Sequence, residues 1–174
     1  MIAHPPVEQM AWVVPDLEQA CRAWHAALGI GPFLISRNLP IVEALHRGQP
    51  SATRFSTAVA QSGSVQIELI EQHDEQPSVY RDTVPAGATG FHHVAVVSPD
   101  FDAECARQRA LGHATASEGR VGDMRFAYFD ATATLGHMIE VVEEKDGIRR
   151  FFNAVRRAAD GWNRDPATLM RELG

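Results

Sequence analysis

The amino-acid sequence contains one short segment twice. The first copy opens at Gln9 and reads QMAWVVPDL, and the second opens at His93 and reads HVAVVSPDF. Alanine, proline, aspartate and a later cysteine recur in both copies at one offset (93 − 9 = 84). A unit repeated over about half of the chain predicts a pseudo-twofold architecture. Each copy also opens on a residue type that can bind a metal ion.

Each copy predicts a β-α-β-β-β unit. An apolar run typical of a strand, 8–14 or 91–97, leads into Pro-Asp, and an expected helix follows at 17–28 or 101–111. Asp16 and Asp100 are the expected helix N-caps. The remaining strands are expected at 33–37, 53–60 and 64–71 in the first copy and at 114–118, 125–129 and 137–142 in the second. Loops are expected at 38–52, 119–122 and 130–136.

These patterns predict an α+β fold and a single domain over 1–174. Its expected parts are a first β-α-β-β-β module at 7–75, a linker at 76–90, a second module at 91–144 and a C-terminal helical extension at 145–174. In the extension, 148–159 predicts an amphipathic helix and 166–173 a short second helix. We expect the first of these helices to pack on the outer face of a sheet or to contact a second copy. A lid over the site is the alternative.

Composition excludes several classes of function. With 22 acidic and 16 basic residues the formal net charge is −6, which disfavours a nucleic-acid surface. No apolar run approaches the ~20 residues of a membrane span, and the start of the chain does not resemble an export signal. Cys21 and Cys105, at equivalent helical positions, are expected to be packing residues in a reducing compartment. We therefore expect a cytoplasmic protein with a small-molecule partner.

A glutamate interrupts the apolar last strand of each copy, Glu68 in the first and Glu140 in the second. A carboxylate on a buried strand face is costly unless a cation compensates its charge. With the two opening residues, these glutamates form a candidate metal site of Gln9, Glu68, His93 and Glu140. One nitrogen and three oxygen donors suit a divalent ion such as Zn, Mn, Ni or Co.

The other histidines near these strands are expected to lie outside the site. His92 neighbours His93 and should therefore face the opposite side of the strand. His137 has the opposite strand parity to Glu140, and His73 lies beyond a strand end.

With these segments the chain resembles the vicinal oxygen chelate superfamily, which includes glyoxalase I, methylmalonyl-CoA epimerase, extradiol dioxygenases and bleomycin-resistance proteins. The resemblance covers roughly 7–144 and is carried by the strand–Pro-Asp-Leu–helix–Leu-Gly opening, by GFHHVAV at 90–96 and by GHMIE at 136–140. It implies paired modules that form an eight-stranded, cup-shaped mixed sheet around a metal ion, and a homodimer. The family's ligand positions fall on Gln9, Glu68, His93 and Glu140, a set similar to that of eukaryotic-type glyoxalase I.

The resemblance also implies a reaction. Glyoxalases and epimerases remove a proton next to a carbonyl through a metal-stabilised enolate. Glu140 is the expected base and Glu68 the partner that returns the proton, and Gln9 and His93 are structural ligands. Glu43 is a second candidate base, although a solvent-exposed loop glutamate is the favoured interpretation. The resemblance does not identify the substrate.

Four basic residues in or near the middle loop of the first copy could bind an anionic group of a substrate, although ordinary surface charge is the favoured interpretation of each. They are Arg37, His46, Arg47 and Arg54. Specificity for glutathione is disfavoured, because glyoxalase I binds glutathione with an arginine and an asparagine, and this chain has Val13 and Gln72 at the matching positions.

Two other functions stay open at the level of sequence. An extradiol ring-cleaving dioxygenase would need a histidine where the chain has Gln9. A non-catalytic small-molecule binder of the same fold would not need the full set of donors.

Overall fold

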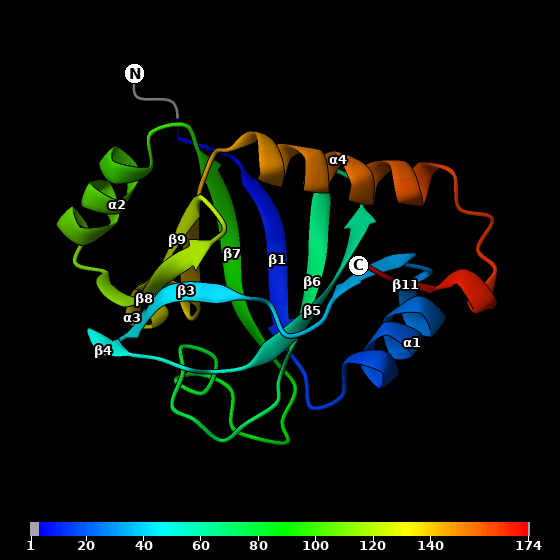
Figure 1. Ribbon diagram of the computed structural model, residues 1–174, viewed down its shortest axis with the longest axis horizontal. Coiled ribbons are helices and arrows are strands. Elements are labelled where there is room, and N and C mark those ends of the chain that lie inside the picture. The colour runs from blue at the N-terminus through cyan, green and yellow to red at the C-terminus, as the bar shows by residue number, and fades with distance from the viewer. Residues whose placement is uncertain (1–3, 174) are drawn as a thin grey trace.

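The computed structural model describes residues 4–173, and within them eleven strands form one mixed sheet (Figure 1). The strands are β1 (Val7–Val13), β2 (Phe33–Ser36), β3 (Ile41–His46), β4 (Gln49–Pro50), β5 (Phe55–Ser62), β6 (Val65–Gln72), β7 (Gly90–Ser98), β8 (Ala114–Val121), β9 (Met124–Asp130), β10 (Met138–Glu143) and β11 (Met170–Glu172). Their order across the sheet is β11-β2-β5-β6-β1-β7-β10-β9-β8-β3-β4.

The helices are α1 (Leu17–Leu28), α2 (Phe101–Ala110), α3 (Thr132–Leu135) and α4 (Asp146–Asp160), with a 3₁₀ turn at Pro166–Thr168. The predicted N-caps are confirmed, because Asp16 accepts a hydrogen bond from the Gln19 N–H and Asp100 accepts one from the Ala103 N–H. None of the helices in the described part of the chain is long and apolar enough to cross a membrane.

The two copies of the repeat meet where β1 pairs antiparallel with β7 (Figure 1). On the outer side of β1 lies β6, paired parallel, and on the outer side of β7 lies β10, also paired parallel. The first half of the sheet continues through β5 and β2, and the second through β9 and β8. The last strand of each copy therefore flanks its own first strand, and both copies contribute to one sheet within one chain.

The prediction of eight strands was incomplete, since three short strands extend the sheet. Residues 38–52, expected as a loop, contain β3 and β4, and β3 pairs with β8 of the other half. The expected helix at 166–173 is instead one 3₁₀ turn followed by β11, which pairs with β2. The expected loop at 119–122 was also wrong, because β8 continues to Val121. The strands β3 and β11 pair with strands far away in the sequence, a signal that local periodicity does not carry.

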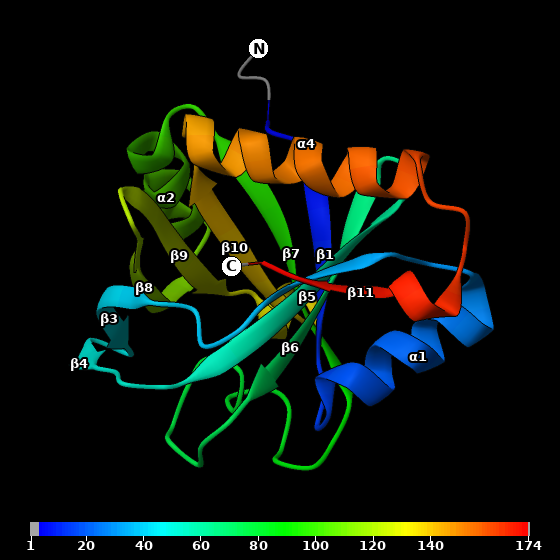
Figure 2. The same ribbon diagram turned by 45° about the vertical axis from the view of Figure 1, so that its right-hand side comes forward.

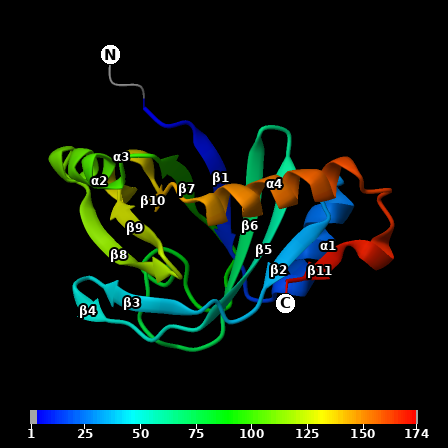
Figure 3. The ribbon, with the colours of Figure 1, turned by 45° about the horizontal axis from the view of Figure 1, so that its top comes forward.

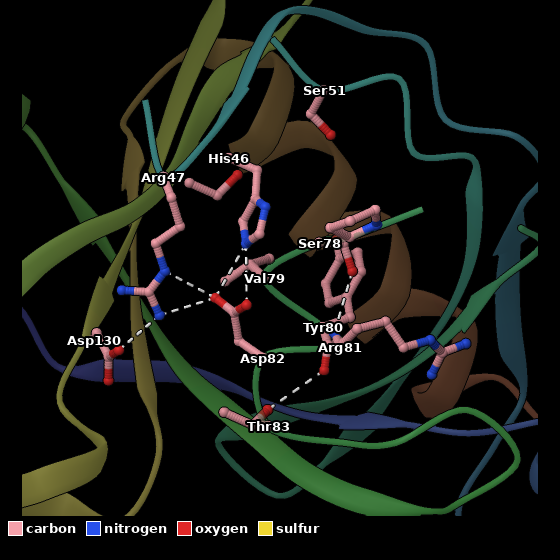
Figure 4. Close-up of polar contacts among 12 residues, drawn as sticks. His46, Arg47, Ser51, Ser78, Val79, Tyr80, Arg81, Asp82, Thr83 and Asp130 are labelled. Atoms are coloured by element: carbon pink, nitrogen blue, oxygen red, sulfur yellow. Dashed lines mark hydrogen bonds and ion pairs between the residues drawn. The ribbon is translucent and has the colours of Figure 1, made fainter. Parts of the chain in front are cut away.

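The segment between the two copies, 76–90, packs into the core rather than hanging outside it. Val79, Tyr80 and Val84 are buried against Ala11 and Met138 of the sheet. Hydrogen bonds also tie the segment to β3 and its turn, because Asp82 accepts from His46 and Arg47 (Figure 4). Arg47 also donates to Asp130 at the end of β9. This segment therefore has a fixed position beside the inner face of the sheet.

The sheet has an outer face covered by α1 and α2 and an inner face covered in part by α4. On the outer face Cys21 packs near Leu69, and Cys105 packs near Val141, which agrees with the expected packing role of both cysteines. On the inner face Val155 of α4 is fully buried against Leu34 and Val59. Figures 2 and 3 show α4 lying across one end of β7, β1 and β6.

The expectation that the C-terminal helix packs on the outer face was therefore wrong, and its position agrees with the alternative of a cover over the site. Contact with a second copy stays a prediction. The apolar stripe of α4 contacts inward-facing residues of both halves of the sheet. Val155 packs on the first half, as described above, and Phe152 packs on Val97 and Val142 of the second half. Arg149 of α4 forms ion pairs with Glu8 and Glu144, which hold the helix against the sheet. Its amphipathic pattern is the same for either face, so only the free inner surface decided the side.

Because Val155 anchors α4 to the sheet, Val155→Ala should lower the free energy of unfolding by about 2 kcal/mol through lost burial and a cavity. Asn153→Ala, on the exposed side of the same helix, should change it by less than about 0.5 kcal/mol. Urea unfolding monitored by circular dichroism measures both values. Equal stability of the two variants would contradict this docking of α4.

Candidate metal centre

The four predicted donor residues lie on the four central strands of the sheet and on its inner face. Gln9 is on β1, Glu68 on β6, His93 on β7 and Glu140 on β10. Residues opposite each other on paired strands project to the same face of the sheet. The strand register therefore gathers side chains that are up to 131 positions apart (140 − 9 = 131).

Two alanines form the floor between these donors. Ala11 stands opposite both Glu68 and His93, and Ala95 stands opposite both Gln9 and Glu140. Both alanines are buried, and they are the pair that recurs in the repeat. Their small side chains leave the space above them to the longer donors on the neighbouring strands.

Three of the donors form a compact cluster. His93 Nε2 lies 3.2 Å from Glu140 Oε2 and 3.6 Å from Glu68 Oε2, and one ligand atom of each of the three residues lies within 4.8 Å of the others. His93 is fully buried, yet its Nε2 makes no hydrogen bond within the described part of the chain. A buried nitrogen without a hydrogen bond beside two carboxylates fits a divalent cation.

Gln9 completes the predicted set in position. It is buried and lines the same cavity as Glu68 and Glu140. Its side-chain carbonyl is a neutral oxygen donor of the kind that divalent ions accept. Its role as a ligand stays a prediction.

The charged form of Glu68 is destabilised in this cluster. Burial, and then the negative charge of Glu140, raise the pKa of Glu68 well above its usual range. A cation between the carboxylates would offset both effects. The cluster is thus electrostatically costly when it stands alone, and a bound cation would stabilise it.

His92 lies on the same side of the sheet as His93, so the expectation that it faces the other side was wrong. Ala11 of β1 pairs with His93, but the next residue, Trp12, pairs with Phe91. His92 is thus the extra residue of a β-bulge, which breaks strand alternation. Its ring packs against Tyr80 and Tyr128 on the inner face.

The contacts of His92 determine which nitrogen of His93 carries a proton. The Val79 carbonyl can only accept, so His92 Nε2 donates to it, at 3.0 Å. Burial lowers the pKa of His92 to about 3, so its ring is neutral and its Nδ1 is an acceptor. His93 Nδ1 must then donate to His92 Nδ1, at 2.8 Å. In the neutral ring, the form of histidine that binds a metal ion, the lone pair then lies on His93 Nε2, the nitrogen that faces the carboxylates.

The cluster opens onto a cavity of about 350 Å³. Its lining comes from both halves of the sheet, from the segment at 76–90, from β3 and from α4. Most lining side chains are apolar, and the polar ones besides the donors are Ser36, Thr57, Tyr80, Asp123 and Tyr128. Such a cavity, apolar with a few converging polar groups, is typical of small-molecule sites.

Tyr80 and Tyr128 are the site residues that the sequence analysis missed. Burial raises the pKa of both phenols well above the usual value, and both line the cavity beside Glu68 and Glu140. Strand parity with Phe126 could have indicated Tyr128. Tyr80 carries no such signal, because it comes from a segment without regular structure.

The residues that the sequence analysis set aside lie outside the centre. His73 hydrogen-bonds Ser56, and His137 contacts its neighbour's carbonyl and the ring of Phe91. Glu43, the alternative base, is exposed and pairs with Arg120. The candidates for anion binding all pair with carboxylates: Arg37 with Glu18 and Glu172, His46 with Asp82, Arg47 with Asp82 and Asp130, and Arg54 with Asp74.

Removal of the acceptor beside His93 should weaken metal binding. His92→Phe leaves His93 Nδ1 without its partner and frees the ring to place its proton on Nε2, so the affinity for Zn²⁺ or Co²⁺ should fall about 10- to 100-fold. His92→Gln, which can accept from His93 and donate to Val79, should recover most of the loss. Competition with a chromophoric chelator measures the affinities. Unchanged affinity in a folded His92→Phe protein would contradict the assignment.

The comparisons with known proteins agree with this architecture. The methylmalonyl-CoA epimerase solved in complex with methylmalonyl-CoA and NH4+ superposes with a TM-score of 0.57 at 19% identity, over 83% of this chain and 97% of that one. The epimerase from Mycobacterium tuberculosis gives 0.55 at 21% identity, over 86% and 97%. A hypothetical protein from Bacillus halodurans C-125 gives 0.57 at 15% identity, over 83% and 97%.

At these identities the solved structures establish a shared fold, and no curated protein matches the chain. The family model described as Glyoxalase/Bleomycin resistance protein/Dioxygenase superfamily matches residues 8–128, which is well over half of the chain and includes Gln9, Glu68 and His93. The chain therefore belongs to the Glyoxalase/Bleomycin resistance protein/Dioxygenase superfamily.

Proposed function

We propose that this protein is a metal-dependent enzyme that removes a proton next to a carbonyl group of a small oxygenated molecule, as an isomerase, epimerase or glyoxalase-like lyase. The observation that carries the proposal is the buried Nε2 of His93, which lies beside Glu68 and Glu140 and hydrogen-bonds neither. The likeness of fold to methylmalonyl-CoA epimerases supports the same class of reaction.

Gln9, Glu68, His93 and Glu140 would hold the ion, and their one nitrogen and three oxygens suit Zn, Mn, Ni or Co. A divalent ion held there supplies a Lewis acid that polarises a carbonyl oxygen and so acidifies the neighbouring C–H. In this proposal Gln9 and His93 serve only as ligands, because an amide is not basic and the lone pair on His93 Nε2 would be bound to the ion.

The two glutamates divide the proton transfers. Glu68 and Glu140 come from β6 and β10, which flank β1 and β7 on opposite sides, so their carboxylates approach the site from the two halves of the sheet. Glu140 takes the proton from carbon, and Glu68 returns a proton to the other face or to the neighbouring position. The pseudo-twofold symmetry of the repeat makes the two positions equivalent.

The surrounding side chains keep water away and orient the substrate. Tyr80 and Tyr128 stay protonated because burial raises the pKa of their phenols, so their hydroxyls remain hydrogen-bond donors. Phe151 and Phe152 of α4 line the side opposite the sheet. A low-polarity enclosure of this kind strengthens electrostatic stabilisation of developing charge.

A non-catalytic small-molecule binder is the second candidate, favoured by the largely apolar cavity. An extradiol dioxygenase is disfavoured, because the cluster within the described residues holds one histidine and two glutamates. The proposal includes three further expectations. They are a cup formed by the eight strands expected from the modules at 7–75 and 91–144, a homodimer, and a cytoplasmic location.

The purified protein should bind about one divalent ion per chain, as measured by elemental analysis after dialysis against Zn²⁺ or Mn²⁺. Glu68→Gln should weaken the binding at least about 10-fold, because it removes one of the two anionic donors. Glu43→Gln, which changes an exposed glutamate outside the cavity, should leave it unchanged. A wild-type protein without metal under these conditions would contradict the proposed centre and favour the non-catalytic binder.

With a panel of 2-oxo compounds and thioesters in D2O, the metal-loaded protein should exchange deuterium into the position next to the carbonyl, as followed by proton NMR. Glu140→Asp keeps a carboxylate donor but withdraws it by one methylene, so exchange per bound metal should fall at least about 100-fold. Glu43→Asp is the matched control. Exchange at the wild-type rate in metal-loaded Glu140→Asp would exclude Glu140 as the base.

A further inference from the structure

The cavity beside the candidate metal centre has mostly apolar walls, and its charged lining residues among those described are all acidic. We infer that it selects an uncharged substrate, with an oxygenated end toward the centre and an apolar, preferably aromatic, body. This inference rests on the proposed function and adds the chemical class of the substrate.

The apolar character comes from both halves of the sheet, from β3 and from α4. Phe55 and Phe126 lie on strands of opposite halves of the sheet, Ile41 comes from β3, and Ile148 and Phe151 come from α4. Phe55 packs edge to face on Tyr80, and Phe126 does so on Tyr128. An aromatic body placed among these rings gains both burial and edge-to-face contacts.

The charges on the cavity wall are all negative. Its charged members are Glu68, Glu140 and Asp123, and no lysine, arginine or histidine lines the cavity within the described residues. A divalent ion would cancel the two glutamates and leave no net positive charge. Asp123 of the β8–β9 turn then adds a negative charge to the lining. An anionic group on the substrate would lose its hydration without gaining a partner.

Three arginines of the segments around the cavity are held in ion pairs of their own. Arg37 pairs with Glu172, Arg120 with Glu43 and Arg149 with Glu8. Moving one of them toward a substrate would break its ion pair. The cavity volume, about 350 Å³, lies at the small end of the ~300–1,000 Å³ usual for ligand sites, so the whole substrate is small.

The test compares two matched probes on the cobalt-loaded protein. Benzohydroxamic acid carries a chelating end and a neutral ring, and its 4-carboxy derivative adds one negative charge to that ring. Binding is followed through the visible spectrum of Co²⁺. The neutral probe should bind at least about 10-fold more tightly than the anionic one, the direction set by the cost of burying an unpaired carboxylate.

The Ile148→Lys variant places a cation on the cavity side of α4 and should reduce this preference at least about 10-fold. Asn153→Lys adds the same charge to the exposed side of the helix and should leave the preference unchanged. Equal or tighter binding of the 4-carboxy probe by the wild-type protein would overturn the inference. Failure of both probes to bind the cobalt-loaded protein would also overturn it.

The lining can also be tested without metal, which separates this inference from the proposed function. Calorimetry on metal-free protein compares p-cresol with 4-hydroxybenzoate, a pair that differs in charge and lacks a chelating group. Preference for p-cresol supports the inference even if no metal binds, a result that would contradict only the proposed function. Preference for 4-hydroxybenzoate would overturn the inference whatever the metal content.

Discussion

The antiparallel pairing of β1 with β7 is the constraint on which the site depends. It sets the first strands of the two repeats side by side, so that Ala11 stands opposite His93 and Ala95 opposite Gln9. The flanking parallel strands then bring Glu68 and Glu140 to the same face. A slip of one residue in this register would turn the donors of one repeat to the outer face.

The buried glutamates and the β-bulge at His92 both lie at the candidate metal centre. Two carboxylates beside one histidine are costly in a protein interior, and burial and mutual repulsion already raise the pKa of Glu68. The bulge at His92 adds an acceptor for His93 Nδ1, and the Val79 carbonyl holds His92 in turn. The segment at 76–90 therefore acts on the site through a backbone carbonyl, although it contributes no ligand.

Sequence reasoning predicted the repeated elements and the helix α4, and it missed the short strands and the buried residues of the irregular segment. The helices α1 and α2, their N-caps and the strands that carry the four donors follow from periodicity and from the duplicated text. The strands β3 and β11 were missed because their partners are distant in sequence. Tyr80 was missed because no pattern in an irregular segment predicts burial.

By itself, the sequence determined that two similar halves exist and that each offers two candidate metal ligands, because a repeat and strand alternation can be read directly from the order of residues. Tertiary structure decided which surfaces close the cavity. The amphipathic pattern of α4 permits either face of the sheet, and only the free inner surface beside Leu34, Val59 and Val97 selects one. The orientation of His92 was decided in the same way, by a mismatch between two paired strands that neither strand reveals alone.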